Sequence, residues 1–274
     1  MKWTGNVRKM GSYVDIHGQV SYHWHGTDVL EPLEAIPLEQ WIGQHVQVTY
    51  EGIIHCAETG RRIKKTFGDG LSYDAFMKSP LACPSIIRPE LSRIHEGVAL
   101  RDEEWERANH LQPHLVYISQ TSHLKVGVTR STNVPSRWVD QGAIGAIVVA
   151  NVPYRQLAGE IEVALKSMIS DRTQWRAMLQ EVKLDGEALV DAKEKCLESL
   201  GLTYESFFED SDEIAALRYP VLTYCPKVTS SKLDKRPCIS GRLVGIKGQY
   251  LMFEDGQVWN VRAHAGYRVS VEVG

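Results

Sequence analysis

The chain has 274 residues, of which 43% are hydrophobic and 24% charged, and its net charge is -3. This composition is typical of a folded globular protein and excludes a disordered or low-complexity chain. No apolar run is long enough to span a bilayer, and the first residues lack the apolar core of a signal peptide, so we expect a cytoplasmic protein with no membrane partner.

The five cysteines are widely spaced, odd in number and form no C-x-x-C pair; they are Cys56, Cys83, Cys196, Cys225 and Cys238. This pattern argues against a disulfide framework and against an intact thiolate zinc site. We therefore expect free thiols in a reducing compartment and no zinc.

The first part of the chain divides into two predicted regions. Residues 1–56 alternate as half-buried strands do, which predicts a β-rich N-terminal region. Residues 57–112 are rich in Gly, Pro and Ser and favour loops, with a short helix or turn-rich linker over 98–112. A loop-rich stretch of this length inside a compact protein usually has a binding or metal-related role.

Residues 113–185 show a pattern of alternating strands and helices. A hairpin is expected over 114–130, and the β-branched run "IGAIVVANV" at 144–152 predicts a strand buried on both faces. The amphipathic spacing of Leu157, Ile161 and Leu165 predicts a helix. The expected helices cover 135–142, 155–169 and 171–184.

The last two regions differ in charge. Residues 186–217 read as an acidic helical segment with two Lys against nine Asp or Glu. Residues 218–274 hold nine Lys or Arg against four Asp or Glu and return to strands, with "EDGQ" as a hairpin turn. The whole chain is predicted to be α+β: a central three-stranded antiparallel sheet with flanking helices, between small β-rich N- and C-terminal parts.

Four polar residues follow this strand and helix order in a characteristic way. Tyr117 ends "LVY", Lys125 opens "KVG", and Arg137 and Glu162 lie on the two following helices. In this order the region 113–170 resembles the GIY-YIG nuclease superfamily. That resemblance implies that Glu162 holds Mg²⁺ or Mn²⁺, Tyr117 orients or deprotonates the attacking water, and Arg137 stabilises the anionic transition state.

Under the same resemblance Lys125 supplies further positive charge at the site. Glu160 stays an alternative to Glu162, because both flank the apolar stripe of their helix. The chain also departs from the family pattern, since "RWVDQG" has no His after Arg137 and no Asn can be placed after Glu162. A catalytically silent binding module, or a protein-interaction scaffold with unknown protein partners, therefore remains open beside a metal-dependent endonuclease.

Phrases across the whole chain resemble a second group. "KVGVTRSTNVPSRWVDQGA", "GRLVGIKGQYLMFEDGQVWNVR" and "RPE" at 88–90 are similar to the bacterial domain of unknown function family 2797. Members of that family are cysteine-rich where this chain has Thr59, Ser72, Ala75, Ala82, Ser85 and Ser92. The segment 57–112 thus resembles a zinc module without its ligands, and a substitute site from His55, Cys56, Cys83 and His95 is a minor alternative.

The basic C-terminal region suggests a polyanion-binding surface. Arg130, Lys247 and Arg262 are the predicted contacts to backbone phosphates of DNA or RNA. The predicted function is nucleic-acid binding, with Mg²⁺-dependent phosphodiester cleavage as the enzymatic alternative.

Overall fold

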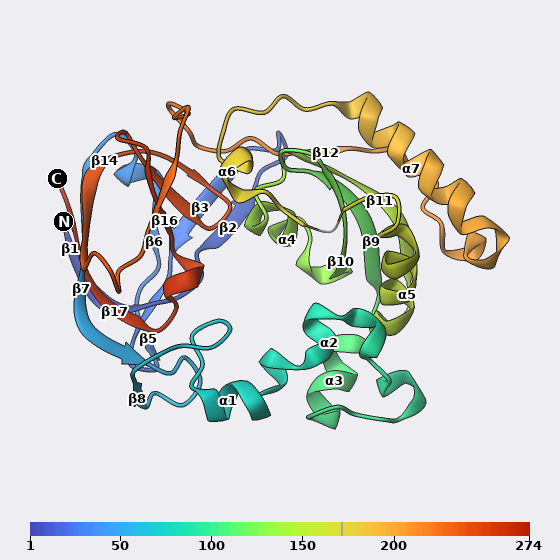
Figure 1. Cartoon of the computed structure of the whole chain (residues 1–274), viewed down its shortest axis with the longest axis horizontal. Helices are drawn as coiled ribbons and strands as arrows, with labels where there is room; N and C mark the ends of the chain where they lie inside the picture. The colour runs from blue at the N-terminus through green and yellow to red at the C-terminus, as the bar shows by residue number, and fades with distance from the viewer. Residues whose placement is uncertain (171) are drawn as a thin grey trace. The chain divides into compact units, whose positions relative to one another are not determined.

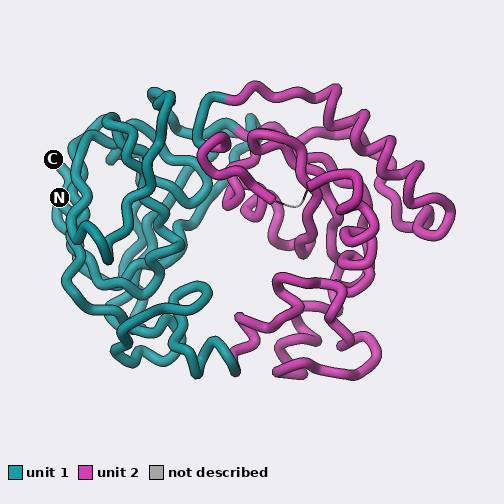
Figure 2. Tube along the Cα trace, in the orientation of Figure 1, with its two compact units in different colours: residues 1–77, 179–181, 218–274 teal, residues 78–178, 182–217 magenta. Residues whose placement is uncertain are grey.

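The computed structural model describes residues 1–170 and 172–274. The chain forms two compact units, one from residues 1–77, 179–181 and 218–274, and one from residues 78–178 and 182–217 (Figure 2). Both units contain β-sheet, and helices belong mainly to the second, so the predicted α+β class is confirmed (Figure 1).

Unit 1 is built on a ten-stranded sheet that joins strands from both ends of the chain. Its order is β13-β16-β15-β14-β7-β17-β1-β4-β5, and β8 pairs with β7. The strands are β1 (Lys2–Val7), β4 (Gly26–Asp28), β5 (Glu31–Pro32), β7 (His45–His55), β8 (Arg62–Ile63), β13 (Thr229–Ser231), β14 (Cys238–Lys247), β15 (Tyr250–Phe253), β16 (Gln257–Asn260) and β17 (Tyr267–Val273). The regions 1–56 and 218–274, predicted separately, thus share one sheet.

Unit 1 is completed by a small sheet and short helices. The order in the three-stranded sheet is β2-β3-β6. The core includes the large buried rings of Trp24, Trp41 and Trp259. The ring centroid of Trp24 lies 5.5 Å from that of Trp41 and 5.9 Å from that of Trp259. The remaining elements are β2 (Gly11–Val14), β3 (Val20–Trp24), β6 (Ile36–Pro37), η1 (Glu39–Trp41), η8 (Arg262–His264) and α1 (Tyr73–Lys78), which ends at the first residue of unit 2.

The sheet of unit 2 is antiparallel, in the order β10-β9-β11-β12. Its strands are β9 (His114–Gln120), β10 (Leu124–Arg130), β11 (Gly145–Val152) and the two-residue β12 (Ala215–Ala216). The three long strands match the predicted hairpin and central strand, and β12 adds a fourth that was not predicted. Alternate residues of β9 face opposite sides, so Val116 and Ile118 enter the apolar core while Tyr117 faces the other way.

Two long helices of unit 2 bury the apolar side of this sheet. Ala158, Ile161 and Leu165 of α5 (Arg155–Leu165) and Leu189 and Cys196 of α7 (Gly186–Leu200) belong to the same core cluster. The other elements are α2 (Pro84–Ile87), α3 (Glu103–His110), α4 (Ser136–Asp140), α6 (Trp175–Met178), η2 (Pro80–Ala82), η3 (Pro89–Leu91), η4 (Ile94–Glu96), η5 (Ser131–Asn133), η6 (Gly201–Thr203) and η7 (Glu205–Phe207).

The helices predicted over 135–142 and 155–169 are slightly shorter in the structure, at Ser136–Asp140 and Arg155–Leu165, and two other helical predictions differ more. The acidic segment 186–217 is helical only to Leu200 and then continues as two 3-10 turns and β12. The helix predicted over 171–184 is reduced to α6, and its first residue, 171, lies outside the described residues. Residues 179–181, which follow α6, belong to unit 1.

Candidate functional site

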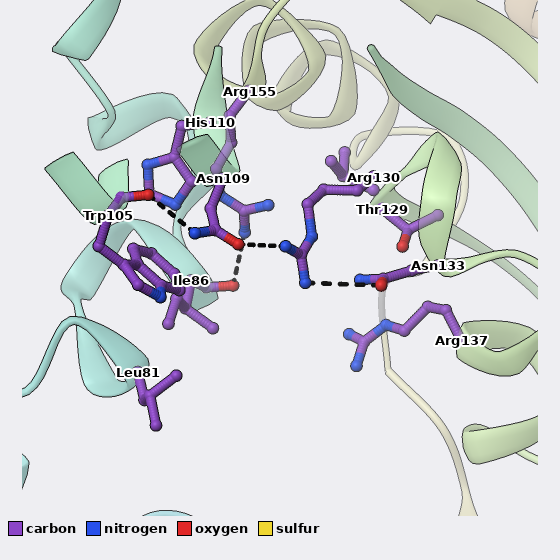
Figure 3. A pocket seen from close by; sticks show the side chains of 11 residues that line it. Leu81, Ile86, Trp105, Asn109, His110, Thr129, Arg130, Asn133, Arg137 and Arg155 are labelled. Atoms are coloured by element: carbon purple, nitrogen blue, oxygen red, sulfur yellow. Dashed lines mark hydrogen bonds between the residues drawn. The ribbon is translucent and has the colours of Figure 1, made fainter. Parts of the chain in front are cut away.

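A polar cavity opens in unit 2 where the end of β10 meets the starts of α4 and α5. It measures about 680 Å³ including space open to solvent. Three arginines, Arg130, Arg137 and Arg155, contribute to its lining (Figure 3). We call this cavity the arginine pocket.

Arg130, the last residue of β10, is held by two neutral amides. Its Nη1 donates to Oδ1 of Asn109 on α3. Asn133, in the amide orientation that satisfies its neighbours, accepts from Nε and Nη2 of Arg130 at 3.2 Å each. Burial lowers the pKa of Arg130 below its ordinary value, although a guanidinium stays charged at neutral pH.

Arg137 and Tyr117 are joined through Gln141. In the orientation that satisfies both neighbours, the Gln141 oxygen accepts from Nε and Nη2 of Arg137 at 3.2 and 3.3 Å, and its nitrogen donates to the Tyr117 hydroxyl at 3.1 Å. Tyr117 itself is fully buried and packs edge-to-face on Trp138, with ring centroids 5.9 Å apart. The predicted phenol and guanidinium therefore do meet, with an amide between them.

Gly127 makes room for this tyrosine. It pairs with Tyr117 across the hairpin, and a Cβ at residue 127 would lie 2.7 Å from the Tyr117 hydroxyl oxygen. Any larger residue would push the ring aside. The glycine of "KVG" is thus required by the position of the tyrosine on the facing strand.

Arg155 begins α5 and is fixed to the backbone of α2. Its Nε donates to the carbonyl of Ser85 at 2.8 Å and its Nη2 to that of Ile86 at 2.9 Å. Burial lowers the pKa of Arg155 to about 10, and the charge of Arg137 acts in the same direction. Glu162 opposes this shift.

The arginines of the pocket are held by neutral groups, although the charge of nearby Glu162 acts on Arg155. Among the residues described by the structure, no Asp or Glu lines the cavity, and none forms an ion pair with Arg130, Arg137 or Arg155. Their partners are amides and backbone carbonyls, which accept hydrogen bonds without cancelling the charge. Guanidinium groups held in this way are suited to an incoming oxyanion.

Glu162 lies near this cluster but outside the cavity lining. It is 8% exposed, and its Oε2 lies 3.4 Å from Nζ of Lys166 one helical turn later. Its charge reaches both Tyr117 and Arg155: burial raises the pKa of Tyr117 above 10, Glu162 adds to that rise, and Arg137 and Gln141 oppose it. The predicted carboxylate is therefore close to the predicted phenol.

The residues present do not fit a resident Mg²⁺ or Mn²⁺ ion. Glu162 already has Lys166 as an ionic partner and shares its surroundings with Arg155. Within the described ranges, no group of three or more His, Cys, Asp or Glu is arranged to hold a metal. Mg²⁺ is held through at least one carboxylate directed at the ion, and here the Glu162 carboxylate is engaged by nearby cations instead. We therefore derive no step through a metal.

Lys125 lies on the same face of the hairpin as Tyr117 but does not line the cavity. Its Nζ donates to Oγ1 of Thr173 at 3.0 Å, and the residue is 5% exposed. Arg155, Asn109 and Trp105 line the pocket without having been predicted. Arg155 opens an amphipathic helix and the other two lie on the short helix α3, and no sequence pattern distinguished them from surface residues.

One of the two candidates in the C-terminal region needs correction. Lys247 was predicted to contact phosphates, but it is fully buried, with its ammonium group 5.4 and 5.6 Å from the ring centroids of Tyr219 and Tyr224. Its position at the end of β14 points it into the core of unit 1. Arg262 forms a two-point ion pair with Asp69, at 2.9 and 2.6 Å, near the surface, and its contact to phosphate stays a prediction.

Some of the positions where the family resemblance implies cysteines lie close together. The Sγ of Cys56 accepts from the backbone of Ser72 at 3.2 Å, and the Ser72 hydroxyl accepts from the backbone of Ala75 at 3.2 Å. Burial raises the pKa of the Cys56 thiol, but hydrogen bonds from Thr59, Ser72 and Glu58 outweigh it and lower the pKa to about 7. Hydrogen bonds thus surround the sulfur at these positions.

The substitute site of His55, Cys56, Cys83 and His95 stays a prediction, because its first two residues belong to unit 1 and the other two to unit 2. Cys83 contacts the Ser85 hydroxyl at 3.1 Å, and His95 stacks on Tyr154 with ring centroids 4.5 Å apart.

Comparison with known proteins places the chain in a family. Across the described part of the chain, no helix has the length and apolar character needed to cross a membrane. No curated protein and no solved structure matches the chain. Residues 43–269 match the model of a family described as "Protein of unknown function (DUF2797)". Since this match covers well over half of the sequence, the chain belongs to the DUF2797 family.

Proposed function

We propose that unit 2 binds nucleic acid by holding a backbone phosphate in the arginine pocket. The observation that carries this proposal is the convergence of three guanidinium groups on one cavity whose described lining contains no carboxylate. Phosphate contacts from Arg supply most of the affinity of sequence-independent nucleic-acid binding. The resemblance of the strand and helix order to GIY-YIG nucleases supports a phosphodiester as the ligand.

Partial burial strengthens the expected interaction. The three arginines are all half-buried, so a phosphate that reaches them exchanges water for fixed donors in a medium of lower dielectric constant. Their neutral partners hold the side chains in place before the ligand arrives. This lowers the entropic cost of binding.

Binding without cleavage is favoured over nuclease activity. A general base must come within hydrogen-bond reach of the water that it activates. Tyr117 is fully buried and is not part of the cavity lining, and Gln141 occupies its hydroxyl. Cleavage remains the second candidate because Tyr117, Arg137 and Glu162 lie near one another.

The test measures the binding of labelled strands of about 12 nucleotides, within the range of known single-strand site sizes, to the wild type and to Arg137→Gln. A duplex and an RNA of the same length complete the set. The matched control is Arg107→Gln, because Arg107 lies in the same unit but pairs with Glu103 at 2.9 Å. Arg137→Gln should weaken binding about tenfold, reduce the salt slope by about one, and leave the fold intact.

Equal affinity of the wild type and Arg137→Gln for every strand would refute the proposal. The same samples, incubated with Mg²⁺ or Mn²⁺ and resolved by length, test cleavage. Products formed by the wild type and lost in Glu162→Gln would replace binding with nuclease activity as the function. Intact strands are the expected result.

A further inference from the structure

The arginine pocket has two walls of different chemistry. Figure 3 shows Leu81, Ile86 and Trp105 on one side of the cavity, with Arg130 and Arg137 on the other. The apolar side chains come from η2, α2 and α3, and the charged ones from β10 and α4. A phosphate alone would use only one of these walls.

The apolar side chains of the first wall are open to solvent. Leu81 is 60% exposed and Ile86 is 37% exposed, although both border the cavity. Behind them, Trp105 packs edge-to-face on His110, with ring centroids 5.3 Å apart and an angle of 85° between the rings. Burial lowers the pKa of His110 to about 3, so this imidazole is neutral at physiological pH.

The two walls are linked by a short polar bridge. Arg130 reaches across to Asn109, which lies on the same helix as Trp105, and the Asn109 amide donates back to the Trp105 carbonyl at 2.8 Å. The guanidinium group of Arg130 is therefore linked to the helix that carries Trp105 through one side chain, Asn109.

We infer that the arginine pocket takes one unpaired nucleotide, with its base against Leu81, Ile86 and Trp105 and its phosphate on Arg130 and Arg137. This inference rests on the proposed function and names the form of nucleic acid that the site selects. Bases in a duplex are stacked and paired, so a base can enter a recess only from a single strand, a frayed end or an extruded position. Contact through the base face is tolerant of sequence.

The experiment compares two single strands that carry the same phosphates. One is oligothymidylate of about 12 nucleotides, and the other has the same backbone with abasic sugars throughout. The wild type should bind the strand with bases at least about fivefold more tightly, which is the lower end of base–aromatic stacking. Ile86→Ser and Trp105→Ala should remove this preference, and Trp105→Phe should retain most of it.

Ile87→Ser is the matched control for Ile86→Ser. Ile87 is the next residue on α2 and is 81% exposed, but it does not line the cavity. Its replacement should leave the preference for bases unchanged. Arg137→Gln should lower the affinity for both strands by the same factor, because it removes a phosphate contact that both strands make.

Failure of this inference can be told apart from failure of the proposed function. Equal binding of the two strands by the wild type, with Arg137→Gln still weakening both, would overturn the nucleotide inference and leave phosphate binding standing. If the wild type binds neither strand, both the nucleotide inference and the proposed function would be overturned. Free thymidine monophosphate offers the same base and phosphate and is tested as a competitor. If it displaces the strand when present at the same concentration as the strand, the pocket would be assigned to a free nucleotide instead.

Discussion

Replacing Gly127 with alanine should disturb the candidate site from the opposite strand. The new Cβ would lie 2.7 Å from the hydroxyl oxygen and 2.8 Å from Cζ of Tyr117. An ordinary van der Waals contact begins near 3.4 Å, so the ring must move by about 0.7 Å. Tyr117 is fully buried, with Trp138 against its ring and Gln141 on its hydroxyl, and it has little room to move.

Overpacking of this kind typically costs about 1–3 kcal/mol, while alanine recovers about 0.4–1 kcal/mol by restricting the unfolded chain. We therefore expect Gly127→Ala to lower the free energy of unfolding by about 1–2 kcal/mol. A displaced ring would also shift Gln141 and Arg137, so strand binding should weaken together with stability.

Urea unfolding followed by circular dichroism measures the stability change, and strand binding is measured on the same preparation. Gly241→Ala is the control, since a methyl group there would lie 3.4 Å or more from its nearest neighbour on a strand with ordinary backbone angles. An unchanged unfolding midpoint and unchanged binding in Gly127→Ala would refute the steric role assigned to this glycine.

Three other expectations follow from buried or partnered groups. Burial lowers the pKa of His110 to about 3 and of His114 to about 4. Below about pH 6.5 the unfolded chain therefore binds more protons than the folded chain. As the pH is lowered from 6.5 towards the folded-state pKa values, the free energy of unfolding should decrease by up to about 1.4 kcal/mol per pH unit for each imidazole. Imidazole NMR titrations should show both rings still neutral at about pH 5, and midpoints near 6.5 would contradict this. Burial lowers the pKa of Lys247 to about 8. Lys247→Met should therefore leave the free energy of unfolding at neutral pH unchanged or higher, and it should not affect strand binding. A marked loss of stability or of binding would show that the ammonium group is needed. The combined replacements Thr59→Cys, Ser72→Cys and Ala75→Cys around Cys56 should create a site for one Zn²⁺. Zinc should raise the thermal unfolding midpoint of this variant, and a chelator should reverse the rise. No metal uptake would show that the four positions do not converge.

The hairpin and its partners were predictable because local patterns determine them. Two short strand-forming runs joined by a polar turn placed β9 and β10, the β-branched run placed β11, and the amphipathic repeat placed α5. The side on which Tyr117 lies follows from strand alternation alone. Its neighbour Gly127 then follows from the register of a short antiparallel hairpin.

The rest of the site depends on contacts between distant segments. Asn109 meets Arg130, and Arg155 meets the carbonyls of Ser85 and Ile86, across long stretches of sequence. Lys247 shows the opposite error: a lysine near the end of a strand is usually solvated, but tertiary packing placed this one between two tyrosines. Sequence patterns carry no information on such pairings.

The central claim is that Arg130, Arg137 and Arg155 together receive a phosphate. The most direct measurement follows the guanidinium Nε–H resonances of the protein by NMR while an oligothymidylate strand is added. The account predicts that the resonances of these three arginines shift together and saturate at one strand per protein, while that of Arg107 stays in place. Shifts confined to other arginines, with these three unmoved, would contradict it.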